Sequence, residues 1–146
     1  MLFRSGGQSG RLFIELREKK SLAYTVAPTS LEGIEVGYVG TYIACSPTKK
    51  DEALAGIRTV LETLANKGPT VAELKRAREF HLGRRAMDFQ GDGFIASHYG
   101  LEALYGIRDF DEQGIARAIE AVNAQRVKDF VRKYLVEPAQ VTAVVG

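Results

Sequence analysis

Hydrophobic residues recur at three- to four-residue spacing along most of this chain, which is the spacing of one face of a helix. The first such stretch follows a glycine-rich turn at residues 6–10, where Ser9 is the predicted N-cap, and it ends at the cations Lys19 and Lys20. From Thr48 onward the same spacing predicts an almost entirely helical chain. The inward positions expected in these two stretches are Leu12, Phe13 and Leu16, then Leu54, Ile57, Leu61 and Leu64.

Two segments between these helical regions are rich in β-branched and aromatic residues instead. Residues 22–29 and 34–43 are predicted strands, and Glu32-Gly33 is the predicted turn of a hairpin between them. Pro138 introduces a last predicted strand at residues 141–145. Alternate residues of the second strand are expected to share one face, namely Ile34, Val36, Tyr38 and Tyr42.

Helix boundaries carry residues that suit them. Gly68-Pro69 predicts a helix end, because glycine takes the left-handed conformation readily and proline cannot continue the helix. Thr70 and Glu73 form a predicted capping box for the next helix, which is expected to run to about Gln90. Further helices are expected around Phe94 to Leu104, Ile115 to Val122 and Val127 to Tyr134.

This order of elements indicates an α+β fold, with an antiparallel-rich sheet packed against several helices in two layers, as a single domain over residues 1–146. A hairpin plus one terminal strand is a thin sheet for so many amphipathic helices. We therefore expect at least one strand of the sheet to lie upstream of Met1 or on another chain. The sheet edge left open would favour a homodimer or the addition of a peptide strand.

Composition excludes several classes of function. Hydrophobic residues make up 45% of the 146 residues, which suits one sizeable core. The net charge of +2 comes from scattered lysines and arginines, so nucleic-acid binding is not predicted. No apolar run approaches the ~20 residues of a membrane span, and none follows residues 1–5 as a signal peptide would require. The lone Cys45 excludes an internal disulfide, and its expected role is that of a small apolar residue.

Familiar catalytic motifs are missing from the sequence. The two histidines, His81 and His98, have no second histidine nearby, and neither H-x-x-E-H nor H-E-x-x-H occurs, so no zinc site is predicted in this chain. There is no G-x-S-x-G nucleophile elbow and no evident histidine partner for Cys45. Residues 6–10 lack the Lys-Ser/Thr of a phosphate loop, so we interpret them as a tight turn.

The most informative stretch is residues 10–26, with the sequence GRLFIELREKKSLAYTV. It resembles the signature of the C-terminal domain of the pitrilysin/insulinase zinc peptidases, which include the mitochondrial processing peptidases. In that family Ser-Arg-Leu-Phe leads through Leu-Arg-Glu-Lys to Gly-Leu-Ala-Tyr and a strand. Gly10 and Ser21 depart from this pattern. The resemblance extends through residues 68–77 to 127–135 and 141–146, and so covers nearly the whole chain.

The resemblance implies a metallopeptidase fold of the LuxS/MPP-like type, here without its first strand and helix. It also implies that zinc is bound elsewhere, by an inverted H-x-x-E-H motif on an N-terminal domain or a partner subunit, so that this chain holds no cofactor. Arg17 and Tyr24 match the arginine and tyrosine that lie seven residues apart in the family and contact the peptide substrate near the scissile bond. The tyrosine would help to stabilise the oxyanion.

The predicted elements are compatible with that role. Arg17 falls in the last turn of the first helix and Tyr24 near the start of the next strand, so the turn at residues 19–21 should fold them together. With Ser21 in place of the usual glycine, a less tight turn is expected. Without a zinc domain, this chain should bind peptide and not cleave it.

Two further functions are compatible with the sequence. The family includes subunits of respiratory complexes that keep the fold without catalysis, so a structural or assembly role is one alternative. The other is a peptide-binding module, in which the edge of the hairpin pairs with an extended peptide. The presence of both Arg17 and Tyr24 favours the peptidase component over the structural or assembly role.

Overall fold

A computed structural model describes residues 10–31, 33, 35–106, 112–138 and 140–145. These residues form two compact units. Unit 1 contains the described parts of Met1–Pro69 and Ala124–Gly146, and unit 2 contains those of Thr70–Asn123. The candidate site lies in unit 1, and each unit is described by itself below.

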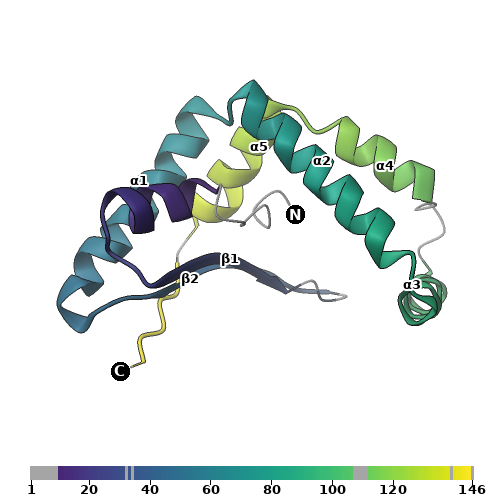
Figure 1. Cartoon of the computed structure of the whole chain (residues 1–146), viewed down its shortest axis with the longest axis horizontal. Helices are drawn as coiled ribbons and strands as arrows, with labels where there is room; N and C mark the ends of the chain where they lie inside the picture. The colour runs from purple at the N-terminus through teal and green to yellow at the C-terminus, as the bar shows by residue number, and fades with distance from the viewer. Residues whose placement is uncertain (1–9, 32, 34, 107–111, 139, 146) are drawn as a thin grey trace. The chain divides into compact units, whose positions relative to one another are not determined.

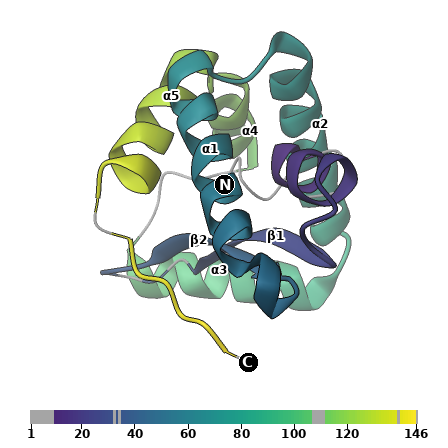
Figure 2. The same cartoon turned by 90° about the vertical axis from the view of Figure 1, so that its left-hand side faces the viewer.

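Unit 1 is built on an antiparallel hairpin covered by helices (Figure 1). Thr25 lies opposite Ala44 at one end of the ladder, and Leu31 lies opposite Tyr38 at the other. Figure 2 shows α1 crossing the hairpin. The elements are the π-helix η2 (Phe13–Lys19), β1 (Thr25–Leu31), β2 (Tyr38–Ala44), the 3-10 helix η3 (Pro47–Lys49), α1 (Lys50–Lys67), α5 (Ala124–Val131) and the π-helix η4 (Arg132–Val136).

The core of unit 1 lies between the hairpin and its helices. It joins η2, the start of β1 and α1, and its buried members are Leu12, Leu16, Leu22, Ala23, Val26 and Val60. Phe13, Ile43 and Ile57 pack against this cluster. On its other side α1 contacts α5 and η4, which bury Val127, Val131 and Leu135. The sheet and helices therefore form the two layers that the sequence predicts.

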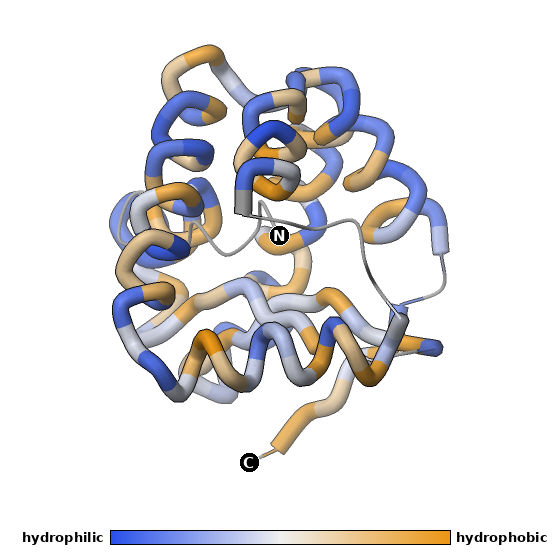
Figure 3. The backbone as a smooth tube through the Cα atoms, turned by 90° about the vertical axis from the view of Figure 1, so that its right-hand side faces the viewer, coloured by the Kyte–Doolittle hydropathy of each residue, from blue (hydrophilic) through white to orange (hydrophobic). Residues whose placement is uncertain are grey.

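Unit 2 is helical, with α2 (Val71–Asp88), α3 (Asp92–Tyr105) and α4 (Glu112–Glu120). The capping box at its start is present: Glu73 N–H donates to the Thr70 hydroxyl, and the Thr70 N–H donates to the Glu73 carboxylate at 2.7 Å. Hydrophobic residues (orange in Figure 3) recur along α3, although none of them is buried. Where α2 meets α3, the rings of Phe89 and His98 lie 5.1 Å apart.

Most of the predicted elements are confirmed, with shifted boundaries. The α+β class, the hairpin and the capping box are present, and Gly68 ends α1 with a φ of 74°. The first strand begins at Thr25 rather than Leu22, because Leu22 and Ala23 are buried in the turn that precedes it. Residues 6–9 of the predicted glycine-rich turn, which include Ser9, and Glu32 of the predicted hairpin turn lie outside the described residues.

Two expectations about unit 1 are wrong. The predicted strand at 141–145 is irregular, because no described strand pairs with it, and Val141 is 98% exposed. The expected inward stripe of α1 is wrong only in part, because Leu61 is buried and Ile57 packs against the core cluster as predicted. Leu54 lines an open hollow on α1 instead of the core, while small residues face inward to admit the side chains of η2. The buried residues of α1 are Ala53, Gly56, Val60, Leu61 and Ala65.

Candidate functional site

The two candidate residues lie at either end of the turn that joins η2 to β1. Leu22 N–H donates to the Leu16 carbonyl at 2.8 Å, and Ser21 N–H donates to the Arg17 carbonyl at 3.1 Å. The bond from Leu22 to Leu16 joins residues that are six apart, whereas the corresponding bond at the end of an α-helix joins residues that are five apart. The extra residue reflects the wider turn of a π-helix. Ser21 has a φ of 49°, in the left-handed region. The turn therefore has the backbone that glycine would favour, and serine adopts it here.

Arg17 is exposed in the last turn of η2, and its guanidinium lies over an aromatic ring. The guanidinium carbon is 4.8 Å from the centroid of the Phe13 ring, which is a cation–π contact. Phe13 is itself half-buried and packs against the core cluster, and the adjoining Leu16 is fully buried. The Arg17 side chain is thus held on a platform that the core supports.

Tyr24 precedes β1 and directs its side chain into solvent, where it is 77% exposed. Its N–H donates to the Ala44 carbonyl at 2.9 Å, although the partner of Ala44 in the ladder is Thr25. Tyr24 and Thr25 thus both face Ala44 at the start of β1, which resembles the arrangement of a β-bulge. The bulge aims the phenol away from the core, while Ala23 and Val26 on either side are buried.

Two lysines brace the segment around the turn. Lys49 Nζ donates to the Ser21 carbonyl at 2.9 Å and so ties the turn to η3, which precedes α1. Lys19 Nζ contacts a Glu15 carboxylate oxygen at 2.7 Å along η2. The Glu15–Lys19 pair is exposed and contributes little to stability. The hydrogen bond from Lys49 to Ser21 connects segments that are distant in sequence. We therefore expect it to fix the position of Tyr24 more strongly than the Glu15–Lys19 pair does.

The polar ends of both candidate side chains are available to a ligand. Within the described part of the chain, neither the Arg17 guanidinium nor the Tyr24 hydroxyl has a hydrogen-bond partner. Both groups are donors that suit peptide carbonyl oxygens, and the guanidinium offers a rigid fork of N–H groups. The sequence prediction missed the role of Phe13, which it assigned to the core. The signal was the four-residue spacing of Phe13 and Arg17 along a helix.

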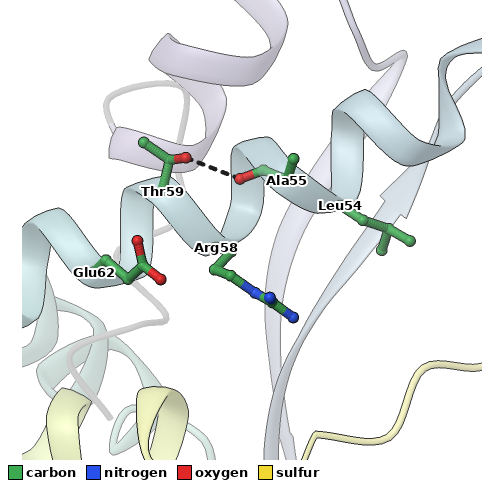
Figure 4. A pocket seen from close by; sticks show the side chains of 5 residues that line it. All are labelled: Leu54, Ala55, Arg58, Thr59 and Glu62. Carbon is green, nitrogen blue, oxygen red and sulfur yellow. Dashed lines mark hydrogen bonds between the residues drawn. The ribbon is translucent and has the colours of Figure 1, made fainter.

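Other candidate positions carry less chemistry. Figure 4 shows the open hollow on α1, whose lining comes from one helix: Leu54, Ala55, Arg58, Thr59 and Glu62. The Thr59 hydroxyl there donates to the Ala55 carbonyl at 3.0 Å and is already satisfied. Among the described residues, no three His, Cys, Asp or Glu side chains gather as metal ligands. The described residues therefore do not provide a set of zinc ligands. None of the described helices is long and apolar enough to cross a membrane.

Comparison with known proteins identifies a family to which the segment with this turn is similar. Residues 2–80, more than half of the chain, match the family model described as the peptidase M16 inactive domain. The chain belongs to this family. The matched range contains η2, the hairpin and both Arg17 and Tyr24. As a member of the peptidase M16 inactive-domain family, the chain is the non-catalytic C-terminal domain of a zinc-protease-like protein.

A sequence relative and two solved structures agree with this assignment. An uncharacterised zinc protease of Streptomyces coelicolor is 28% identical over 130 residues, which are 89% of this chain and 28% of that protein. A peptidase M16 inactive domain from Pseudomonas fluorescens matches with a TM-score of 0.75 at 21% identity, over 92% of this chain and 32% of that one. The inactive peptidase domain of a putative zinc protease from Bordetella parapertussis has a TM-score of 0.68 at 23% identity, over 92% of this chain and 72% of that one.

Proposed function

We propose that this M16 domain holds the peptide substrate of a zinc peptidase, with Arg17 and Tyr24 as the contacting residues. The observation that carries this proposal is the pair of unoccupied donors at one turn, Arg17 on its Phe13 platform and Tyr24 on its bulge. An arginine at a helix end is ordinarily just a solvated charge. Here both side chains sit on backbone that the core fixes, which gives a ligand a defined geometry to meet.

The two side chains have different tasks in this proposal. The Arg17 fork donates to backbone carbonyl oxygens of the peptide and fixes its register. The Tyr24 hydroxyl donates to the oxygen of the scissile carbonyl, which gains negative charge as the tetrahedral intermediate forms. A phenol stabilises that oxygen without bringing a second charge into the site. A bound zinc ion, held by another domain, would supply the activated water.

A separate zinc-bearing domain is part of the proposal. The chain spans 28% of the length of its Streptomyces relative, whose name marks it as a zinc protease. An H-x-x-E-H motif in the remainder of the protein, or in a partner subunit, would complete the site. Peptide substrates in extended form fit best, because the donors of Arg17 and Tyr24 are suited to backbone rather than to particular side chains.

The test is a set of point variants in the complete zinc-bearing enzyme. Tyr24→Phe should lower kcat by about 100- to 1,000-fold, the usual cost of one oxyanion donor. Arg17→Ala should lower kcat/KM, because the peptide loses the donors that fix its register. Lys20→Ala and Tyr42→Phe are matched controls, since both side chains are exposed, lie in the same unit and have no place in the proposed site. Their rates should stay within about twofold of wild type, and the zinc content should be equal in all variants.

A structural role would give a different result. If Arg17→Ala and Tyr24→Phe keep wild-type rates while core variants lose stability, the turn belongs to assembly and the proposal fails. The proposal also fails if neither the complete protein nor a partner subunit contains an H-x-x-E-H motif and no peptide is cleaved.

A further inference from the structure

His98 lies at the corner where α3 leaves α2. In Figure 1 α3 runs across the direction of α2, and none of its residues is buried. The two helices meet near the turn between them, where the ring centroid of Phe89 lies 5.2 Å from that of Phe94 and 5.1 Å from that of His98. The rings of Phe94 and His98 stack at an angle of 6°. His98 is thus part of the small contact that sets the direction of α3 within unit 2.

One nitrogen of the His98 ring faces two groups of opposite charge. Its Nε2 atom lies 3.4 Å from Nη2 of Arg85 on α2, and 3.2 Å from Oε1 of Glu102, one turn further along α3. The side chains of His98 and Glu102 are only 17% and 19% exposed, so solvent screens their contact weakly. Among the described residues, the aromatic rings around His98 are those of Phe89, Phe94 and Tyr99. Within the described part of unit 2, Arg85 and Glu102 are therefore the charged groups that face the ring.

The Nε2 atom cannot bond to both neighbours at once. A ring nitrogen without a proton accepts a hydrogen bond, and one with a proton donates. A guanidinium only donates, and an ionised carboxylate only accepts. Without a proton, Nε2 accepts from Arg85 and turns its lone pair towards Glu102. With a proton, it donates to Glu102 and meets the N–H groups of Arg85. The proton therefore decides whether His98 is bonded across to α2 or along α3.

Arg85 favours the form of the ring in which Nε2 accepts. Its guanidinium carbon lies 4.6 Å from the centroid of the Phe89 ring, and its Nε atom is buried without a hydrogen-bond partner among the described residues. A buried donor without a partner is unfavourable, so a second unpaired N–H on the same side chain would add to that cost. We therefore expect a neutral His98 ring to carry its proton on Nδ1 and to accept from Arg85. A ring with two protons has no acceptor left, and this bond is lost.

We propose that His98 is a proton-controlled latch between α2 and α3. The neutral ring holds Arg85 and keeps α3 against the end of α2. The imidazolium repels the guanidinium, pairs with Glu102 on its own helix, and so releases α3. Gly91 and Gly93 at the start of α3 give the backbone the freedom to absorb the movement. Imidazole ordinarily changes charge between about pH 5 and 8, so mild acid is the trigger. The latch does not depend on the proposed peptide site of unit 1.

NMR spectroscopy of the 146-residue chain between about pH 5 and 8 tests the latch. At the upper end of this range, the nitrogen shifts of the His98 ring should show a proton on Nδ1 and none on Nε2. As the ring gains its second proton, the nuclear Overhauser contacts from Phe89 to the rings of Phe94 and His98 should be lost with the same midpoint. A neutral ring protonated on Nε2, or contacts that persist through the titration, would overturn the proposal.

His98→Gln keeps the hydrogen bonds of the latch and removes its charge. A glutamine amide accepts through its oxygen and donates through its nitrogen, so it can satisfy Arg85 and Glu102 together at every pH. The contact between Phe89 and Phe94 should then persist over the whole range. His81→Gln changes the other histidine of the chain and is the matched control, which should keep the wild-type transition. A transition that survives His98→Gln, or one that His81→Gln abolishes, would refute the assignment to His98.

Two further variants test the partners of the ring separately. Glu102→Gln removes the carboxylate that stabilises the imidazolium, so the transition should move to lower pH, and an unchanged midpoint would contradict the pairing with Glu102. Arg85→Met keeps an apolar side chain beside Phe89 but removes the donors, so the contact between Phe89 and Phe94 should already be lost at neutral pH. A contact as strong as in the wild type would show that Arg85 does not hold α3, and would refute the latch. Should Arg85→Met fail to fold, the titrations of the wild type and of His98→Gln decide by themselves.

Discussion

Gly56 of α1 provides the sharpest test of how the candidate site is held in place. A Cβ atom added at this position would lie 2.5 Å from Cδ2 of Leu16, the fully buried residue that precedes Arg17. Carbon atoms in good contact are about 3.5–4.0 Å apart, so Leu16 would have to move by about 1 Å. The perturbation is Gly56→Ala, made both in the wild-type chain and in a Leu16→Ala background.

The expected energies follow from two opposing effects. Overpacking of a core lowers the free energy of unfolding by about 1–3 kcal/mol, whereas replacing glycine by alanine inside a helix raises it by about 1 kcal/mol. Gly56→Ala should therefore destabilise the wild-type chain by about 0–2 kcal/mol. Leu16→Ala should cost about 3–5 kcal/mol by itself, because it leaves a cavity. In that background the new methyl group meets no obstacle, and Gly56→Ala should stabilise by about 1 kcal/mol.

Urea unfolding measures these differences in the wild-type chain, the two single variants and the double variant. The dependence of the unfolding free energy on urea concentration should be the same in all four proteins. Gly83→Ala is the control, because a Cβ at Gly83 in α2 has no neighbour within 4 Å and should have the same effect in both backgrounds. The coupling energy between positions 16 and 56 should be about 1–3 kcal/mol. A coupling near zero would refute the packing of Leu16 against Gly56, and with it the anchoring of Arg17 through the core.

Two other substitutions probe the same turn. Ser21→Gly should stabilise unit 1 by about 0–1.5 kcal/mol, since the left-handed backbone costs serine about 1–2 kcal/mol and the conformational freedom of glycine costs about 0.5–1 kcal/mol. A lower unfolding midpoint in urea would contradict this account of Ser21. Phe13→Leu keeps an apolar contact with the core but removes the ring beneath Arg17, so kcat/KM of the complete enzyme should fall about two- to fivefold. The same fall for Phe13→Leu in an Arg17→Ala background would show that Phe13 acts independently of the guanidinium.

The helices and the hairpin could be predicted because local residues determine them. Thr70 and Glu73 make their capping box from within four residues, and Gly68 ends α1 with a positive φ that glycine adopts readily. The strand at 141–145 could not be settled in this way, since a strand exists only beside a partner, and valines alone do not provide one. The inward face of α1 depends on how Leu16 meets Gly56, which is a tertiary contact.

The candidate site was predictable as a pair of residues and not as a geometry. Arg17 and Tyr24 emerged from a sequence resemblance, and the structure places both at the surface of one turn. The π-helix beneath Arg17 and the bulge beneath Tyr24 each depend on a single extra residue in the backbone path. Side-chain periodicity is insensitive to such local insertions, so neither could be expected from the pattern of hydrophobic positions.

The contact at the end of α1 bears on how the polypeptide is organised in sequence. A Cβ on Gly68 would lie 3.1 Å from the Lys128 side chain and 3.7 Å from the Ala124 carbonyl oxygen, so the chain leaves unit 1 and re-enters it at nearly the same point. The entropy of closing a loop grows only slowly with its length. Unit 1 can therefore accommodate segments of very different size between Pro69 and Ala124. This junction is a natural insertion point, at which the helical unit could be exchanged or shortened while the turn that carries Arg17 and Tyr24 is kept.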